Sequence, residues 1–240
     1  MKQDLNLVAS EYFPQAATEL ENHLILNWYP HRVISRTGHV QSMLELGLGH
    51  GITAPIFAAA CDRLVIVEGA STVIDLFRRR HPDSAAEIVE AYFEDYTTDE
   101  RFDAIVMGFV LEHVEDPDAI LRKYRACLKP GGRLYVAVPN AKSMNRRLGL
   151  ELGLIDDIYS LNANDHAQGH RRQYCRDTLS EAVTRAGYEI SHVEGIYLKP
   201  LPLHVLRTLE NFEANLQAML KVGVDFPDLC VGLLMELRVR

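Results

Sequence analysis

The sequence lacks long apolar runs and closely spaced cysteines. No stretch approaches the roughly 20 consecutive apolar residues that a membrane-spanning helix needs, and residues 1–10 lack the apolar centre of a signal peptide. Its four cysteines, Cys61, Cys127, Cys175 and Cys230, form no CxxC pair, which favours free thiols in a reducing compartment over a disulfide or zinc framework. We therefore expect a cytoplasmic protein with no membrane partner.

Basic residues are fewer than acidic residues. There are 25 Lys and Arg against 33 Asp and Glu, a formal net charge of −8. Nucleic-acid binding depends on many Lys and Arg contacts to phosphates, so this balance disfavours a nucleic-acid partner. The 240 residues, 48% of them hydrophobic, suffice for a full core in one large domain, alone or with a small attachment.

Short apolar runs alternate with helical patterns along the chain. Strands buried on both faces are predicted at 42–46, 63–68, 87–90, 102–107 and 133–138, and helices between them at 52–60, 72–80 and 117–128. Strands joined by helices predict a parallel sheet that is covered on both faces. Later patterns predict helices at 177–186 and 203–222, and strands at 188–194 and 230–240.

Three glycines at alternate positions, Gly47, Gly49 and Gly51, follow the first predicted strand in the stretch MLELGLGHG. In an open α/β sheet, ligands bind where this strand turns into its helix, and glycine lets them approach the backbone. Glu68 ends the second predicted strand, where its carboxylate can accept two hydrogen bonds from a ribose diol. NAD and S-adenosylmethionine both carry such a ribose, but the dinucleotide fingerprint requires glycine at Ile52, which disfavours NAD. A tight turn without a ligand is the structural alternative.

The strand ends, taken together, resemble those of the class I S-adenosylmethionine-dependent methyltransferases. The motifs that carry the resemblance are, in order, LELGLGHG at 44–51, VE at 67–68, FDAIV at 102–106, VLEHV at 110–114 and LKPGGRL at 128–134. The resemblance covers residues 40–140, and the segment YCRDTLSEAVTRAGYEI is similar to the end of the same fold. It implies a Rossmann-like α/β fold with a seven-stranded, mostly parallel sheet, an antiparallel last strand and helices on both faces.

The resemblance implies S-adenosylmethionine as cofactor and S-adenosylhomocysteine as product. It places the methionine part over Glu45, Gly47 and Gly49, and the ribose on Glu68. The residues implied beside the adenine and the rest of the cofactor are Tyr92, Phe93, Glu94, Phe109 and Val110. Tyr92 stands where many relatives have Asp, so a nearby carboxylate, Glu94 or Asp95, or a backbone carbonyl is expected to accept from the adenine amino group. Ordinary core packing is the alternative for the two phenylalanines.

Methyl transfer needs an acceptor held in line with the S–CH3 bond, and a base assists when the acceptor is a hydroxyl or a protonated amine. Histidine is the usual base at neutral pH. The candidate catalytic residues are His113, after the fourth strand, and His166 and His170, in a long segment without a predicted element. The candidate acceptor-binding residues are Tyr29, Asn140, Asp165, Arg171 and Tyr174. A helix cap is the alternative role for His113, and a plain turn is the alternative for Asn140.

The segment 165–174 has two further interpretations. His166 and His170 are spaced for a metal site on a helix, with Asp165 as third ligand. Gly169 disfavours that helix, and we predict no metal. A solvated polar loop is the other interpretation.

The sequence predicts an N-terminal helical cover over residues 1–36 and a methyltransferase domain over 37–240, with substrate-side insertions at about 139–175 and 196–229. The helix at 203–222 either lines the substrate pocket or pairs two subunits in a homodimer. The segments NHLILNWYPHR and IYLKPLPLHVL are similar to the branch that acts on small molecules of antibiotic or cell-surface glycan pathways. We therefore predict methyl transfer from S-adenosylmethionine to an oxygen or nitrogen of a secondary metabolite or sugar-like acceptor. An NAD-dependent dehydrogenase and a non-catalytic cofactor-binding protein are the alternatives.

Overall fold

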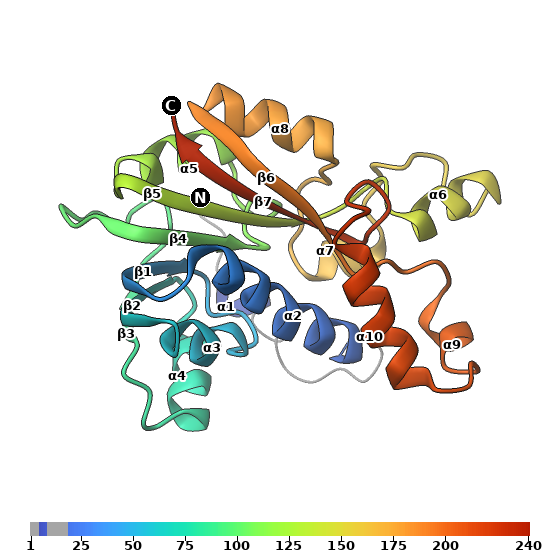
Figure 1. Cartoon of the computed structure of the whole chain (residues 1–240), viewed down its shortest axis with the longest axis horizontal. Helices are drawn as coiled ribbons and strands as arrows, with labels where there is room; N and C mark the ends of the chain where they lie inside the picture. The colour runs from blue at the N-terminus through green and yellow to red at the C-terminus, as the bar shows by residue number, and fades with distance from the viewer. Residues whose placement is uncertain (1–4, 9–18) are drawn as a thin grey trace.

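The computed structural model describes residues 5–8 and 19–240, and its centre is a seven-stranded sheet (Figure 1). The strands, in chain order, are β1 (Val40–Leu46), β2 (Cys61–Glu68), β3 (Glu87–Glu90), β4 (Phe102–Gly108), β5 (Leu128–Pro139), β6 (Tyr188–Ile196) and β7 (Gly232–Val239). Their order across the sheet is β3-β2-β1-β4-β5-β7-β6. β7 runs antiparallel to both of its neighbours, and the other pairs are parallel. The predicted seven-stranded sheet with an antiparallel last strand is confirmed.

Helices pack on both faces of the sheet, because consecutive strand side chains point to opposite faces. Leu44 and Leu46 of β1 join a hydrophobic core with α5 (Pro117–Arg125) and α8 (Arg176–Arg185). Met43 points to the other face and joins a second core. The helices of that second core are α2 (Glu19–Thr37), α3 (Thr53–Ala58), α4 (Ser71–Arg80) and α10 (Phe212–Gly223). The predicted helical cover of both faces is therefore confirmed.

Two predicted elements differ from their expected form. Residues 87–90 form β3, which is the edge strand of the sheet, so this strand is half exposed and not buried on both faces. The predicted helix at 203–222 divides into α9 (Leu203–Leu206) and α10. The division lies before Asn211, whose φ of 55° is left-handed and interrupts a right-handed helix.

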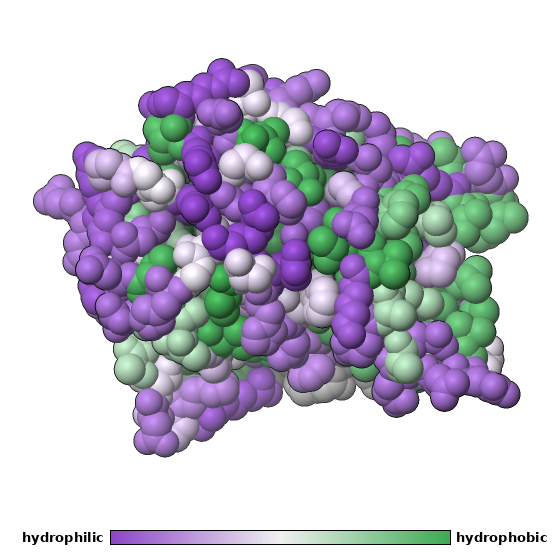
Figure 2. Space-filling model, in the orientation of Figure 1, coloured by the Kyte–Doolittle hydropathy of each residue, from purple (hydrophilic) through white to green (hydrophobic). Residues whose placement is uncertain are grey.

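The insertion at 139–175 contains two short helices that the sequence pattern does not predict. They are α6 (Met144–Glu151) and α7 (Ala163–Ala167). α6 buries none of its side chains, so it has no apolar stripe of helical period for a sequence pattern to detect. Large exposed apolar side chains gather on this insertion and on the one at 196–229 (Figure 2). They are Leu148, Leu152, Leu154, Tyr159, Leu201, Leu209, Val222 and Phe226.

α2 lies across the second face of the sheet (Figure 1). Two ion pairs connect it to β6 and β7. Arg32 donates to both carboxylate oxygens of Glu194 on β6, at 2.7 and 2.9 Å. Arg36 pairs with Glu236 on β7 at 2.5 Å. Both carboxylates are buried, so loss of either arginine would remove the shortest ion pair of a buried charge. Of the predicted cover, the structure describes α1 (Leu5–Val8) and α2, and its remaining residues lie outside the described part.

The C-terminal helix α10 packs within the chain. Leu216 and Leu220 are buried in the second core, together with Tyr29 of α2. The homodimer stays a prediction. Within residues 5–8 and 19–240, no helix has both the length and the apolar character to cross a membrane.

Candidate active site

The glycine loop after β1 has a left-handed backbone at all three glycines. Gly47, Gly49 and Gly51 have φ angles of 86°, 47° and 73°, which residues with a side chain rarely adopt. A Cβ atom on Gly47 would lie 3.7 Å from Phe93 and 3.9 Å from Val110. The structure thus brings three predicted cofactor-binding residues, from three separate segments, to one place at the carboxyl end of the sheet.

Glu68 ends β2 and is tied to the glycine loop. Its Oε2 accepts from the backbone N–H of Leu48 at 2.9 Å, and its Oε1 accepts from that of Ala70 at 2.7 Å. Burial raises the pKa of this carboxyl, and the backbone N–H groups oppose the rise. The N–H groups of Gly69 and Gly49 contribute to the same effect. The structure therefore holds the Glu68 carboxylate at the end of β2 beside the glycine loop, and its role as ribose acceptor stays a prediction.

Glu45, near the end of β1, has one carboxylate oxygen ready for a ligand. Thr53 donates to its Oε1, whereas Oε2 is buried and has no hydrogen-bond partner among the described residues. Burial raises the pKa of Glu45 from 4.5 to about 8. A buried polar atom without a partner calls for an explanation, and a cationic group of a ligand would supply one.

Tyr29 of α2 reaches the end of β4. Its ring meets that of Phe109 edge to face, with centroids 5.7 Å apart. A Cβ on Gly108 would lie 2.7 Å from the Tyr29 Cζ and closer still to its hydroxyl oxygen, so only glycine fits beneath this ring. The N-terminal helix thereby contributes a buried aromatic side chain to the strand end where the acceptor is expected.

Phe109 itself has a strained backbone. Its φ of 59° lies in the left-handed region, which costs a residue with a side chain about 1–3 kcal/mol. Its N–H donates to the carbonyl of Ala137 at 2.8 Å, which fixes the turn after β4. Such strain collects at functional sites, and here it directs an aromatic side chain toward Tyr29.

Residues 92–94, which the sequence predicts to lie beside the adenine, follow β3 and accept hydrogen bonds from side chains of α5. The carbonyl of Phe93 accepts from the Tyr124 hydroxyl at 3.0 Å, and that of Glu94 accepts from Lys123 Nζ at 2.6 Å. Phe93 and Tyr92 are half-buried, and the side chain of Glu94 is exposed. Phe93 reaches the glycine loop, where its ring would lie 3.7 Å from a Cβ on Gly47.

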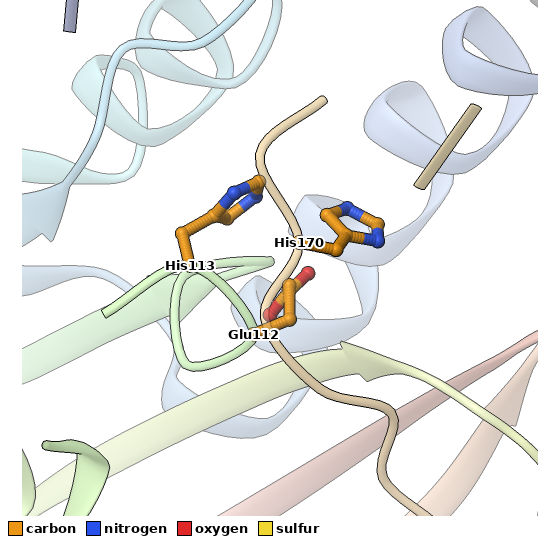
Figure 3. A group of neighbouring side chains, drawn as sticks. All are labelled: Glu112, His113 and His170. Carbon is orange, nitrogen blue, oxygen red and sulfur yellow. The ribbon is translucent and has the colours of Figure 1, made fainter. Parts of the chain in front are cut away.

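A second cluster joins the turn after β4 to the long loop before α8. The rings of His113 and His170 meet edge to face with centroids 4.8 Å apart (Figure 3). The Arg171 N–H donates to the Glu112 carbonyl at 2.8 Å. Arg172 donates to the carbonyls of Leu111, Val114 and Glu115, so its guanidinium holds the loop against the turn.

Burial perturbs both titratable groups of the turn. It lowers the pKa of His113 to about 4 and raises that of Glu112 to about 7. His113 is therefore neutral at pH 7, the form in which one ring nitrogen has a lone pair for a metal, and it is a weak base.

The structure separates the two histidines of the loop. The Asp165 Oδ1 lies 3.1 Å from His170 Nδ1, and both side chains are nearly buried. The other oxygen of Asp165 accepts from the Asn162 N–H and caps α7. His166 is exposed, so Asp165 and His170 join His113 in one cluster and His166 does not.

The remaining acceptor-binding candidates have structural partners. Arg171 is exposed and pairs with Glu115 at 3.4 Å. Tyr174 is buried, with its hydroxyl 3.5 Å from the Leu111 carbonyl. The amide of Asn140 donates to the carbonyls of Pro227 and Cys230 at 3.2 and 2.8 Å. These contacts hold the loops together, and the roles of these three candidates in acceptor binding stay predictions.

Two residues of the site were not among the candidates from the sequence. Thr53 donates a hydrogen bond to Glu45. The sequence feature that could have identified it is a hydroxyl residue at the start of the helix after the glycine loop. Glu112 is fully buried, and its signal was an acidic residue inside the apolar stretch VLEHV, directly before His113.

Comparisons with known proteins identify relatives of this arrangement. A family model described as a methyltransferase domain matches residues 15–193. The cypemycin N-terminal methyltransferase of Streptomyces sp is 30% identical over 113 residues. This match covers 45% of the present chain and 46% of the relative, about half of its length. The ubiquinone biosynthesis O-methyltransferase of Pseudomonas putida (strain W619) is 27% identical over 76% of this chain and 78% of the relative. The crystal structure of the N-methyltransferase NodS from Bradyrhizobium japonicum WM9, in complex with S-adenosyl-L-homocysteine, aligns over 99% of both chains with a TM-score of 0.59 and 16% identity.

Proposed function

Since this chain belongs to the S-adenosylmethionine-dependent methyltransferases and has their class I fold, we propose that it methylates an oxygen or nitrogen atom of a small-molecule acceptor. The resemblance seen in the sequence is confirmed for the family, the fold and the cofactor. Membership of this family decides against the NAD-dependent dehydrogenase.

The residues at the glycine loop fit S-adenosylmethionine. The unpartnered Glu45 oxygen is suited to the amino group of its methionine part, and the Glu68 carboxylate, as an acceptor, is suited to its ribose hydroxyls. Phe93 and Val110 flank Gly47, where they would contact the rest of the cofactor. When bound, the cofactor supplies a methyl group already activated by the sulfonium.

The observation that carries the acceptor proposal is the gathering of ring side chains at the β4 end. Tyr29 and Phe109 meet edge to face there, and His113 of the following turn meets His170 in the same way. Tyr29 is buried and the other three rings are partly buried, which suits this end to a small acceptor. The exposed apolar side chains of the two insertions support an acceptor with an apolar part.

An oxygen or nitrogen acceptor must lose a proton during transfer. His113 and His170 lie together beside the strand end. Burial lowers the pKa of His113 to about 4, which makes it a weak base at pH 7, so His170 is the candidate proton acceptor of the pair. Asp165 orients the ring of His170 through Nδ1. The cluster is therefore our candidate for acceptor deprotonation.

A turnover assay tests the acceptor class. S-adenosylhomocysteine release would be measured with panels of phenols, alcohols and amines, each with and without an apolar substituent. We expect turnover with at least one oxygen or nitrogen acceptor and a lower KM for its apolar derivatives. Turnover only with RNA or folded proteins would overturn the proposal.

A further inference from the structure

Glu112, His113 and His170 bring three donor groups together in a buried place. A carboxylate oxygen of Glu112 and one ring nitrogen from each histidine all lie within 4.8 Å of one another (Figure 3). Figure 3 shows the Glu112 side chain projecting from the turn after β4 toward the segment that carries His170, with both imidazole rings above it in this view. The three donors thus come from two segments far apart in the sequence.

The Glu112 carboxylate lacks partners that a buried acid normally has. The side chain is 0% exposed, and neither of its oxygens has a hydrogen-bond partner within the described ranges. A buried carboxylate is retained only where a positive charge or a donor compensates for lost hydration. This orphaned group points to a cation in the cluster.

The surroundings of His170 are those of a metal ligand. Its Nδ1 lies 3.1 Å from the Asp165 carboxylate, so an Nδ1–H donated to Asp165 leaves Nε2 as the free donor. Metal-bound histidines commonly have such a carboxylate on the second ring nitrogen, which fixes the ring and its tautomer. The backbone bond from Arg171 to Glu112 keeps His170 and Glu112 in register.

We propose that Glu112, His113 and His170 bind one divalent transition-metal ion, for which Zn²⁺ is the best-suited candidate. One carboxylate oxygen and two imidazole nitrogens are a common donor set for such ions. Donor atoms around Zn²⁺ lie about 3.3 Å apart, so the side chains must close on the ion by roughly an ångström. The sequence spacing had indicated a different metal site, with His166 and His170 as ligands. His166 is exposed and does not join the cluster.

Three protein ligands leave at least one coordination position open. Sites of this kind bind a water or a substrate atom, in contrast to closed structural sites with four protein ligands. Resting on the proposed function, the open position would take the acceptor oxygen or nitrogen and lower its pKa, so that its proton is lost to water. With both imidazoles bound to the ion, the ion would take the place of a histidine base. Binding of the ion itself does not depend on that function.

Metal titration of the full chain tests the site. The protein, freed of metal by dialysis against a chelator, would be titrated with Zn²⁺ and with Co²⁺, followed by elemental analysis and the visible absorption of bound Co²⁺. We expect one ion per chain and a Tm increase of about 5–10 °C at a hundredfold excess over Kd.

Variants assign the ion to these residues. Glu112→Gln and His170→Ala should each weaken binding at least about tenfold, and Asp165→Asn should weaken it about 10–100-fold. His204→Ala, which removes an exposed histidine on α9, is the matched control and should bind as the wild type does. Far-ultraviolet circular dichroism identifies any variant that does not fold. If His170→Ala does not fold, metal binding by the near-isosteric Glu112→Gln still tests whether these residues bind the ion.

Two results would overturn the metal proposal. One is absence of bound ion in the wild type, which would leave an internal Glu112–His170 pair. The other is loss of binding in His166→Ala with retention in Glu112→Gln. Titration with S-adenosylmethionine on the same samples separates the proposals: cofactor binding without metal overturns only this one, and metal binding without cofactor overturns only the proposed function.

Discussion

The imidazole of His113 packs edge to face on that of His170, with ring centroids 4.8 Å apart. One ring follows β4, and the other belongs to the loop before α8. Arg172 secures the contact by donating to three carbonyls of the turn. The proposed acceptor side is therefore formed by a loop that packs on a strand end, whereas the proposed cofactor side is formed by the ends of β1 and β2 themselves.

Replacing Glu68 by alanine should weaken binding of S-adenosylmethionine. The change removes the ribose acceptor and frees the Leu48 and Ala70 N–H groups. Each charge-assisted hydrogen bond contributes about 1.5–3 kcal/mol, so we expect Kd to rise by about 10–150-fold. Isothermal titration measures this, with Glu90→Ala as control on the neighbouring strand. Equal affinities of the two variants would contradict the assignment.

Glu45 should make the free protein less stable as the pH rises. Its pKa is about 8 in the folded state against an ordinary 4.5, so the folded protein keeps a proton that the unfolded chain releases. The associated stability is complete below about pH 4.5 and is lost as the pH rises through about 8. Glu45→Gln should flatten the decline in urea midpoint over this window, and Glu90→Gln should not. Identical pH profiles for Glu45→Gln and the wild type would be evidence against a buried, protonated Glu45.

Binding of S-adenosylmethionine at neutral pH should release a proton from Glu45. A cationic amino group beside the carboxyl favours its ionised form, which lowers the raised pKa. Calorimetry in buffers of different ionisation enthalpy would report release of nearly one proton at about pH 7, falling to zero well above about pH 8. The Glu45→Gln variant should show no such release. Unchanged proton release in that variant would place the titrating group elsewhere.

Gly108→Ala should displace Tyr29 and destabilise the protein by about 1–3 kcal/mol. The new methyl group would overlap the hydroxyl and Cζ of Tyr29. Tyr29→Phe removes the closer of these atoms, so the double variant should recover part of the loss. Urea unfolding of the four proteins in the cycle measures the coupling. Gly149→Ala, in α6, serves as control, because a Cβ there would meet only Ile155 Cγ1, at an ordinary contact distance of 3.9 Å. Additive effects would show that the two residues do not meet.

Arg172→Ala should loosen the acceptor loop without affecting the cofactor side. Three carbonyls of the turn after β4 lose their donor, at a cost of about 1–3 kcal/mol. We expect faster amide exchange over residues 165–174, a lower kcat and an unchanged Kd for S-adenosylmethionine. Arg176→Ala, which breaks an exposed pair with Asp228, should have little effect. A large loss of cofactor affinity in Arg172→Ala would contradict this separation of the two sides.

Local patterns in the sequence determined the sheet and the cofactor side. Buried parallel strands read as continuous apolar runs, and the residues proposed to hold the cofactor lie at or directly after the ends of such runs. The places of Gly47 and Glu68 in the fold could be predicted because they depend on strand ends, which are local features. The edge strand β3 was placed correctly, but its exposure depends on having no neighbour on one side.

Only the tertiary structure decided the acceptor side. His113, Glu112 and His170 meet because a loop folds back on a distant turn, and no spacing in the chain encodes that contact. The spacing of His166 and His170 instead indicated a shared helix face, which the structure does not form. Tyr29 likewise reaches Gly108 only because α2 is fastened to β6 and β7 by buried ion pairs. Local periodicity reports which elements form, whereas burial and long-range contacts decide which side chains come together.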